Sequence, residues 1–248
     1  MTTMTVLEIV QDIASDMTSD EVNSITDTLE SMQIARIVQS SYLEMMSNKN
    51  WKHLEQLSTL DSSGDTAKPT HMRMPSNTKE LKDVQYDKIK TGETRSRIKP
   101  VTYVTPDAFL RQTNLLNNDN ADVTVVTDVS GVKLLIKNDT PPTYYTSFDD
   151  NYVVFDSYDS AVDTTLQSSK TQCIAVHSPT FTLSDTHTPN LPEEAFPGFL
   201  AEAKSTCFAR IKQAPDQKSE QQAKRQRTWL SRKGWKAGTG MQFPDYGR

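Results

Sequence analysis

Hydrophobic residues near the N-terminus recur with the spacing of an amphipathic helix. Thr5 is followed three residues later by Glu8, which is the pattern of a capping box and marks the start of a helix. The expected buried face consists of Val6, Ile9, Val10, Ile13 and Met17.

A second apolar stripe follows after the polar break at 18–20. Asp27 and Glu30 form another helix-start signal. The stripe then continues to about Ser47, through Ile34, Ile37, Val38, Tyr42, Met45 and Met46. We therefore expect two N-terminal helices packed as an antiparallel pair.

The period changes in the middle of the chain, where short runs of β-prone residues alternate with turn residues. The cluster at 61–65 predicts a hairpin, 82–89 alternates like a strand, and 91–99 is polar and predicts a loop. A short helix is expected from Asp107 to about Leu116, with Pro106 in its first turn. Strands are expected at 123–127, 132–137, 143–148, 152–155 and 172–176, with Phe181 and Leu183 on one more. This spacing indicates a small antiparallel sheet or sandwich.

The C-terminal part returns to helical spacing. Pro192, Glu193 and Glu194 indicate a helix start, and Pro215 must kink or break the helix that follows. A second segment from about Asp216 to Lys233 is almost wholly polar, and a helix of that kind needs a packing partner. The expected buried stripe before the proline is Phe196, Phe199, Leu200, Ala203, Cys207, Phe208 and Ile211.

These patterns predict an α+β protein in which terminal helices form a bundle and the middle is β-rich. The expected segments are an N-terminal helical pair at 1–50 and a β-rich domain at 51–190. A C-terminal helical segment at 191–236 would pack with the N-terminal helices. Gly234, Gly238 and Gly240 then predict an extended tail at 237–248.

Charge is distributed unevenly in this chain, whose net charge is −5. From Glu8 to Glu44 there are eight acids and one base, whereas Lys218 to Lys236 holds seven bases and one acid. An acidic front and a basic tail favour head-to-tail self-contact, a charged partner or nearby nucleic acid.

The remaining composition indicates a protein of a reducing, aqueous compartment. Two cysteines do not make a disulfide framework, the first residues lack the features of a signal peptide, and no apolar run is long enough to span a membrane. The hydrophobic fraction of 35% is low for a compact monomer and suggests extensive loop or long solvated helices. A subunit whose surface is buried against other copies can also have such a composition.

Candidate chemistry is sparse, and we expect neither an enzyme nor a cofactor. The eight glycines form no phosphate-binding motif, and no zinc-protease or serine-hydrolase motif is present. On a strand, Cys173 and His177 would project from the same face with Ala175, which could begin a metal or thiol site. No second Cys/His pair has ligand spacing, so a structural role is favoured. The acids between Asp149 and Asp163 lack the spacing of a calcium loop. The isolated histidines, without an evident partner in the sequence, are His53, His71 and His187.

The basic tail is the strongest functional signal because its cations are interleaved with tryptophans. Such a pattern suits docking on an acidic partner with indole anchors, contact with nucleic acid, or a solvated helix face. Partner docking is the interpretation favoured here, with nucleic-acid binding as the alternative. The residues are Lys224, Arg225, Arg227, Trp229, Arg232, Lys233, Trp235 and Lys236.

Several segments resemble the head-to-tail adaptor proteins of short-tailed bacteriophages. At the front these are 7–16 and 19–25, and in the second half they are 163–173, 191–197, 201–205, 221–233 and the terminal Tyr-Gly-Arg. The resemblance covers both ends well and the middle loosely. The family's tail helix runs on where Pro215 stands here, which favours a kinked helix in this chain.

The resemblance implies a structural subunit of the virion neck, assembled in the host cytoplasm without a membrane. It implies a ring, usually twelvefold, that joins the portal protein to a tail tube or nozzle protein. DNA would pass through the ring without sequence-specific binding. The residues expected to contact the portal or a neighbouring subunit are Lys224, Arg225, Arg227, Trp229, Arg232, Lys233, Trp235, Phe243, Tyr246 and Arg248.

Overall fold

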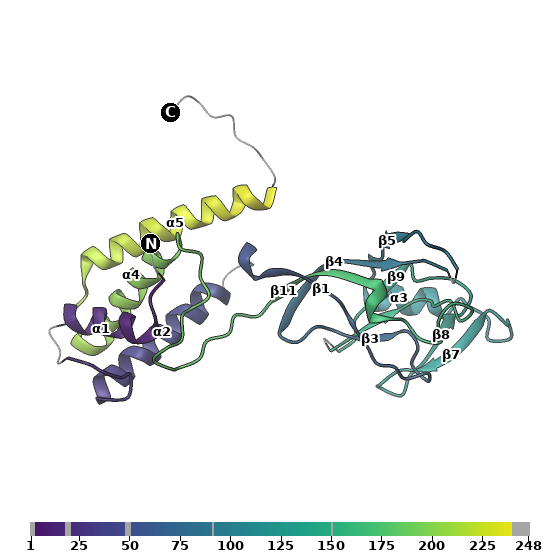
Figure 1. The fold of residues 1–248 in the computed structure, drawn as a ribbon, viewed down its shortest axis with the longest axis horizontal. Coiled ribbons are helices and arrows are strands. Elements are labelled where there is room, and N and C mark those ends of the chain that lie inside the picture. The colour runs from purple at the N-terminus through teal and green to yellow at the C-terminus, as the bar shows by residue number, and fades with distance from the viewer. Residues whose placement is uncertain (1–2, 18–20, 48–50, 91, 150, 240–248) are drawn as a thin grey trace, which may run out of the picture. The chain divides into compact units, whose positions relative to one another are not determined.

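The chain folds as two compact units, one built from both of its ends and one from its middle (Figure 1). The computed structural model describes residues 3–17, 21–47, 51–90, 92–149 and 151–239, and the side chains of residues 231–239 lie outside this description. The helical unit comprises residues 1–54 and 179–248, and the β-rich unit comprises residues 55–178. The α+β class expected from the sequence is confirmed.

Four α-helices form the helical unit. They are α1 (Val6–Asp16), α2 (Leu29–Ser47), α4 (Phe196–Cys207) and α5 (Gln217–Thr239), with the short 3-10 turn η1 (Lys52–Leu54) and the π-helical turn η3 (Phe208–Lys212). Helix α1 begins with the predicted capping box, because the Thr5 hydroxyl accepts from the Glu8 amide and the Glu8 carboxylate accepts from the Thr5 amide. Both interactions satisfy amide groups that the first helical turn cannot pair internally.

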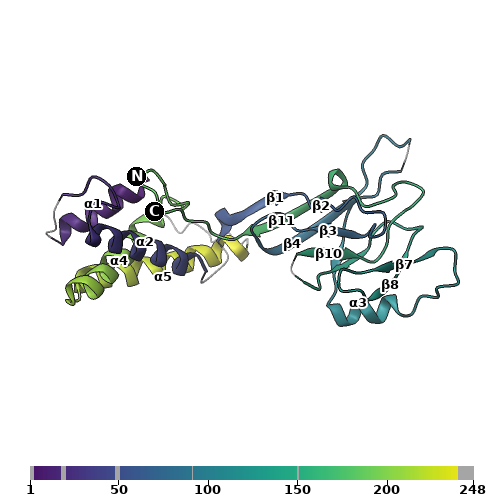
Figure 2. The same cartoon turned by 90° about the horizontal axis from the view of Figure 1, so that it is seen from below.

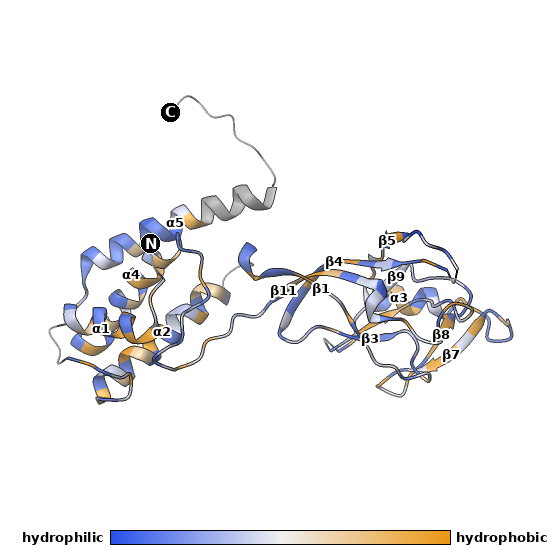
Figure 3. Cartoon of the chain, in the orientation of Figure 1, coloured by the Kyte–Doolittle hydropathy of each residue, from blue (hydrophilic) through white to orange (hydrophobic). Residues whose placement is uncertain are grey.

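Apolar faces hold the helical unit together. Helix α2 packs against both α1 and α4, and α5 packs against α4. Figure 3 shows hydrophobic positions gathered along α1, α2 and α4, whereas the coloured part of α5 is mostly hydrophilic. The core side chains include Ile9, Ile13, Ile34, Tyr42, Met46 and Phe199, all fully buried.

Two sequence-based expectations about the C-terminal helices need correction. Helix α4 begins at Phe196, because the residues from Pro192 form a turn in which the Ala195 amide donates to the Pro192 carbonyl. Helix α5 runs through Gly234 and Gly238 to Thr239, so residues 237–239 are helical where an extended tail was expected. Pro215 does break the helix, since α4 ends in the π-helical turn and Gln213 takes a left-handed conformation with φ 54°.

The β-rich unit contains two larger sheets and a separate hairpin. The first sheet has the order β1–β11–β4–β5, with strands Glu55–Ser58, Thr171–His177, Thr78–Asp87 and Ile98–Pro100. The second has the order β2–β3–β10–β9–β6, with strands Asp61–Ser62, His71–Arg73, Tyr152–Phe155, Tyr144–Thr146 and Thr102–Tyr103. The hairpin pairs β7 (Val123–Thr127) with β8 (Lys133–Lys137), and the short helices are α3 (Pro106–Thr113) and the 3-10 turn η2 (Ser168–Lys170).

Pairing within this unit is mostly antiparallel, and the structure departs from the strands and pairing expected of the sequence in three places. Strand β1 pairs with β11, more than a hundred residues away in the chain, rather than with the next strand. Strand β5 lies inside the segment 91–99 that was expected to be a loop. The strand expected at Phe181 and Leu183 is wrong, because both residues belong to the helical unit, where Phe181 packs on Tyr42 with ring centroids 5.2 Å apart.

One hydrophobic core serves the whole β-rich unit. It takes Val84, Tyr86 and Cys173 from the first sheet and Met72, Val153 and Phe155 from the second. Helix α3 and the β7–β8 hairpin lie side by side and complete the core (Figure 2). They contribute Phe109, Val126, Leu134 and Ile136.

No helix in the described part of the chain is long and apolar enough to cross a lipid bilayer.

Candidate functional site

Helix α5 carries most of the residues singled out from the sequence, and only a narrow stripe of it is needed for packing. Ala223 and Leu230 are buried, seven residues apart on the same side of the helix. Between them Gln226 lies against Gly198 of α4, where a side-chain carbon on Gly198 would meet the Gln226 Cβ at 3.0 Å. The close approach of α5 to α4 therefore depends on the absence of a side chain at Gly198.

The other described residues of α5 are largely exposed, but they do not form one continuous patch. Residues two apart on an α-helix are separated by about 200° around its axis. Arg225 and Trp229, four residues apart, consequently share one flank, whereas Lys224 and Arg227, three apart, share the opposite one. The sequence placed these four residues together, and the helix divides them between two flanks.

The two flanks differ in whether their cations already form ion pairs with described residues. Lys224 donates to the Glu220 carboxylate at 2.8 Å, and this hydrogen bond raises the pKa of Lys224. Neither Arg225 nor Arg227 forms an ion pair with any described residue. Trp229 retains 46% of its surface exposed, which is unusual for an indole and makes the Arg225 flank the better candidate for binding a partner.

The remaining predicted interface residues cannot be placed in this site from their side chains. Arg232, Lys233 and Trp235 fall within α5, but their side chains lie outside the described part of the chain. Phe243, Tyr246 and Arg248 fall outside the described residues altogether. For these six residues an interface role stays a prediction.

The acidic front is partly neutralised within the helical unit itself. Lys204 of α4 lies 2.7 Å from the Asp12 carboxylate and 2.6 Å from that of Asp16. Lys212 lies 3.4 Å from the Glu30 carboxylate. These contacts join α4 and η3 to α1 and α2, so several front acids already have partners and are not all free to attract a basic tail from another copy.

The two cysteines are buried and held in their thiol form. Burial raises the pKa of Cys173 to about 11, and the thiol donates to the Ser58 carbonyl at 3.2 Å. Burial likewise raises the pKa of Cys207 to about 12. In the pairing of β11 with β4 the register shifts between Ile174 and Ala175 and again between Val176 and His177, because β4 has an extra residue at each of these points. Within the described residues no three potential metal ligands gather in one place.

The fold brings a buried histidine, His71, against a half-buried carboxylate that the sequence did not indicate. The Nε2 atom of His71 lies 3.0 Å from Asp128, which stands in the turn of the β7–β8 hairpin. Burial acts to raise the pKa of Asp128, but hydrogen bonds from Ser130, His71 and the Val129 amide outweigh it and lower the pKa to about 2. The pair is separated by 57 residues in the chain, and no local spacing rule could have indicated it.

This pair does not have the order of a hydrolase triad. The Ser130 hydroxyl donates to Asp128 rather than to His71. A catalytic histidine must stand between the nucleophile and the acid, because it takes the proton of the nucleophile. The arrangement instead ties the hairpin to β3 and satisfies the carboxylate of Asp128.

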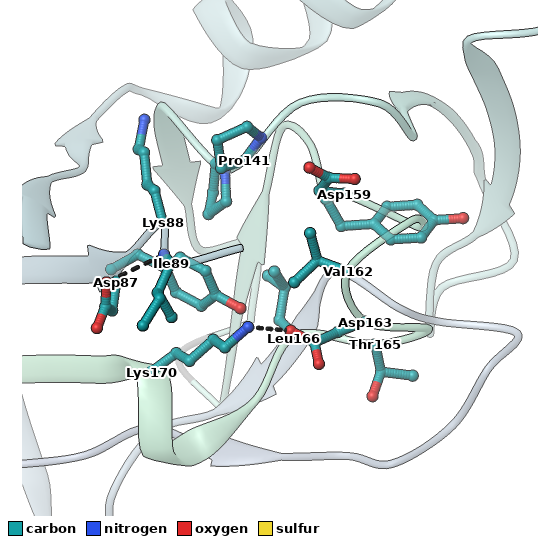
Figure 4. Close-up of a pocket in the computed structure, with 13 residues that line it drawn as sticks. Asp87, Lys88, Ile89, Pro141, Asp159, Val162, Asp163, Thr165, Leu166 and Lys170 are labelled. Carbon is teal, nitrogen blue, oxygen red and sulfur yellow. Dashed lines mark hydrogen bonds and ion pairs between the residues drawn. The ribbon is translucent and has the colours of Figure 1, made fainter. Parts of the chain in front are cut away.

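A small pocket lies in the β-rich unit (Figure 4). It is bounded by Tyr86, Lys88, Pro141, Val162 and Lys170, with Lys170 turned toward its ion-pair partner Asp163. Its volume of about 20 Å³ has room for about one water molecule. A metabolite therefore does not fit there without rearrangement.

A scan against known protein families found no match for this chain, and a search of curated protein sequences found none either.

Proposed function

We propose that this chain is a structural adaptor subunit that forms a ring in the neck of a bacteriophage, between the portal and the tail. The proposal starts from the resemblance of both chain ends to the adaptors of short-tailed phages. The observation that carries it is the Arg225–Trp229 flank of α5. This flank presents a cation without an ion pair among the described residues, next to an indole that is 46% exposed.

The physical form of the flank suits docking better than catalysis. Arginine and tryptophan are the side chains most enriched among residues that dominate binding energy at protein interfaces. A helix held on its own unit by Ala223, Gln226 and Leu230 can offer its other side without loss of packing. In the proposed ring each subunit makes a heterologous contact with the next, and such contacts close when the rotation between subunits allows it.

Two variants of equal charge change test this proposal. Arg225→Glu reverses the charge on the Trp229 flank, and Arg227→Glu reverses it on the opposite flank of the same helix. We expect Arg225→Glu to weaken binding of the chain to the phage's portal by about thirtyfold, the effect of losing a dominant interface residue. Arg227→Glu is expected to change the affinity by less than about fivefold. Binding is measured by surface plasmon resonance, and both variants are checked by circular dichroism.

The result that would overturn the docking site is equal binding by both variants and the wild type. A closed ring beneath the portal, seen by cryo-electron microscopy of the mixture, would establish the adaptor role independently of these variants. Absence of any complex with the portal would sink the adaptor function itself. The terminal residues Phe243, Tyr246 and Arg248 belong to the proposal through the resemblance, and deletion of residues 240–248 tests them in the same assay.

A second function is favoured by the basic composition of α5, namely binding of nucleic acid by that helix. It predicts that the free chain binds DNA with an affinity that falls steeply as the salt concentration rises. It also predicts that substitution of Lys218, Arg225 and Arg227 removes this binding. The adaptor is preferred because the described cations of α5 are divided between flanks and Lys224 is already paired with Glu220.

A further inference from the structure

A second concentration of positive charge lies in the β-rich unit, at the end of β4 and in the segment 91–99 that was expected to be a loop. We name residues 88–99 the basic ribbon; apart from Thr91, which lies outside the described residues, it consists of the residues that follow β4, the connection, and the first residues of β5 (Figure 1). The ribbon holds one acid, Glu93, and five bases. The bases are Lys88, Lys90, Arg95, Arg97 and Lys99.

The pairing of β4 with β5 brings like charges together. Tyr86 stands opposite Lys99, and the Lys88 amide donates to the Arg97 carbonyl at 3.1 Å, which sets Lys88 opposite Arg97. Because side chains alternate along a strand, Lys88, Arg97 and Lys99 emerge on the same face. Like charges that face each other across strands are destabilising, so the arrangement has a cost that an anion would relieve.

The surroundings of the ribbon leave most of this charge uncompensated. Arg97 is paired with Glu93 at 3.0 Å. Lys90, Arg95 and Lys99 are exposed and form no ion pair with any described residue. The pKa of Lys88 is lowered by its partial burial and by the nearby charge of Lys99, against the opposing effect of Asp156. The cations are thus crowded enough to disfavour one another.

Protection of a sheet edge accounts for only part of this pattern. Strand β5 is the edge of its sheet, and Lys99 and Pro100 are residue types that discourage pairing with another chain. Lys88 and Lys90 follow the inner strand β4, however, and Arg95 lies in the connection. The small pocket beside Lys88 has room for about one water, so Lys88 does not serve a buried ligand there either.

The rest of the β-rich unit is acidic, which sets the ribbon apart. The unit contains seventeen acids and thirteen bases, and five of those bases lie within these twelve residues. We infer that the basic ribbon binds the phosphate backbone of double-stranded DNA without reading its sequence. The inference rests on the proposed function for the presence of DNA, while the binding surface is distinct from the α5 flank that would meet the portal.

The composition of the ribbon favours a phosphate backbone over an acidic protein surface. Thr94 and Ser96 alternate with Arg95 and Arg97, and hydroxyl groups beside arginines are frequent donors to phosphate oxygens. The ribbon has no aromatic side chain to anchor a protein partner and no Asn or Gln to recognise bases. Residues 92–99 bound an open hollow of about 630 Å³.

Three triple variants of the full chain test the inference with the same change of net charge. The ribbon variant is Lys90→Gln, Arg95→Gln and Lys99→Gln. The matched control, Lys79→Gln, Lys133→Gln and Lys137→Gln, removes three exposed lysines elsewhere in the same unit. The helix variant is Lys218→Gln, Arg225→Gln and Arg227→Gln. Binding to a fluorescein-labelled duplex of arbitrary sequence is measured by anisotropy across a salt series starting at low ionic strength.

The ribbon variant is expected to lose about tenfold or more in affinity at low salt. The slope of log affinity against log salt should fall in magnitude by about 3, since each phosphate contact contributes about 0.9. The control and helix variants should keep the wild-type slope. An equal loss in the ribbon and control variants would overturn the inference, as would a loss confined to the helix variant or no DNA binding by the wild type.

Two further outcomes separate this inference from the proposed function. If the ribbon variant loses salt-sensitive self-association in analytical ultracentrifugation instead of DNA binding, the ribbon contacts another copy of the chain and the inference is wrong. If DNA binding behaves as expected but the wild type forms no complex with the portal, the adaptor function fails while the phosphate-binding surface stands. If the wild type binds the portal but does not bind DNA, the inference is wrong while the adaptor function stands.

Discussion

The two units of this chain exclude water from their interiors in different ways. The helical unit does so with apolar faces, and its charged contacts, such as Lys204 with Asp12 and Asp16, lie at the borders between helices. The β-rich unit buries polar groups as well. Seven of the nine buried polar residues in the described chain belong to it. Among them are Thr113, Ser157 and Thr171, whose hydroxyl groups each donate to a backbone carbonyl. The stability of the β-rich unit must therefore depend more on satisfied hydrogen bonds and on pH.

The difference has a structural origin in how each unit is connected. Helices satisfy their backbone groups internally and need only an apolar stripe to pack. The β-rich unit joins two short sheets and a hairpin, so side chains must bridge segments that backbone pairing does not reach. Examples are the Thr171 hydroxyl, which accepts from the Leu60 amide at 2.9 Å, and Asp128, which binds His71. Buried groups of this kind cost more to disrupt than exposed ones.

The largest expected effect is the loss of an aromatic ring from the helical core. Phe199 is fully buried and packs edge-on to Tyr42 and Phe196, with ring centroids 6.1 and 6.0 Å away. Phe199→Ala should lower the free energy of unfolding of the helical unit by about 3–5 kcal/mol, because it removes the ring and leaves a cavity. Hydrogen exchange with mass spectrometry in increasing urea would show earlier opening of α2 and α4.

Peptides from β4 and β11 should keep their protection in the same experiment. Leu29→Ala is the matched control, because Leu29 is in the same unit but 73% exposed, and its effect should stay within about 0.5 kcal/mol. Equal loss of protection in both units would show that the two do not open independently, and the comparison between them would fail.

The second prediction concerns acid unfolding of the β-rich unit. The folded pKa of Asp128, about 2, lies below its ordinary value of 3.8. The unfolded chain therefore binds the proton more readily, and the stabilisation is present above pH 4 and is lost as the pH falls toward 2. Asp128→Asn should lower the free energy of unfolding at neutral pH by roughly 2 kcal/mol.

The same variant should also flatten the pH dependence of unfolding between pH 4 and 2. Asp119→Asn serves as the control, because Asp119 is an exposed carboxylate of the same unit. Urea unfolding followed by near-ultraviolet circular dichroism at several pH values measures both. An Asp128→Asn variant as stable as the wild type at pH 7 would mean that the bond to His71 contributes nothing net.

The sequence predicted those features that depend on neighbouring residues and missed those that depend on distant ones. Thr5 and Glu8 lie one turn apart, and their capping box is present as expected. The β7–β8 hairpin likewise follows from two alternating runs around a turn. By contrast, the pairing of β1 with β11 depends on which strand the tertiary fold brings to the edge of β11. Nothing in the local sequence of Glu55–Ser58 specifies that partner.

The candidate sites show the same division. Spacing alone indicated a polar helix with cations and tryptophans. Its two flanks can be told apart only in the structure, where the burial of Ala223 and Leu230 shows which side of the helix packs. The basic ribbon was not predicted from the sequence, because its five cations are spread over twelve residues. Only the pairing of β4 with β5 brings Lys88 and Lys99 together.

The smallest expected effect tests whether charge matters at the borders of the helical unit. Burial acts to lower the pKa of Lys204, but hydrogen bonds and attraction from Asp12 and Asp16 outweigh it and raise the pKa. The ion pairs therefore stabilise the fold below pH 10.5 and lose their effect as the pH rises through the folded pKa. Lys204→Met keeps the aliphatic stem and should lower the free energy of unfolding by only about 0.5–1 kcal/mol, since Asp12 and Asp16 are partly exposed. Urea unfolding in low and high salt measures the difference, which should shrink as salt rises. A loss as large as that of Phe199→Ala would mean that the helices are held by charge rather than by their apolar faces, and would reverse the comparison of the two units.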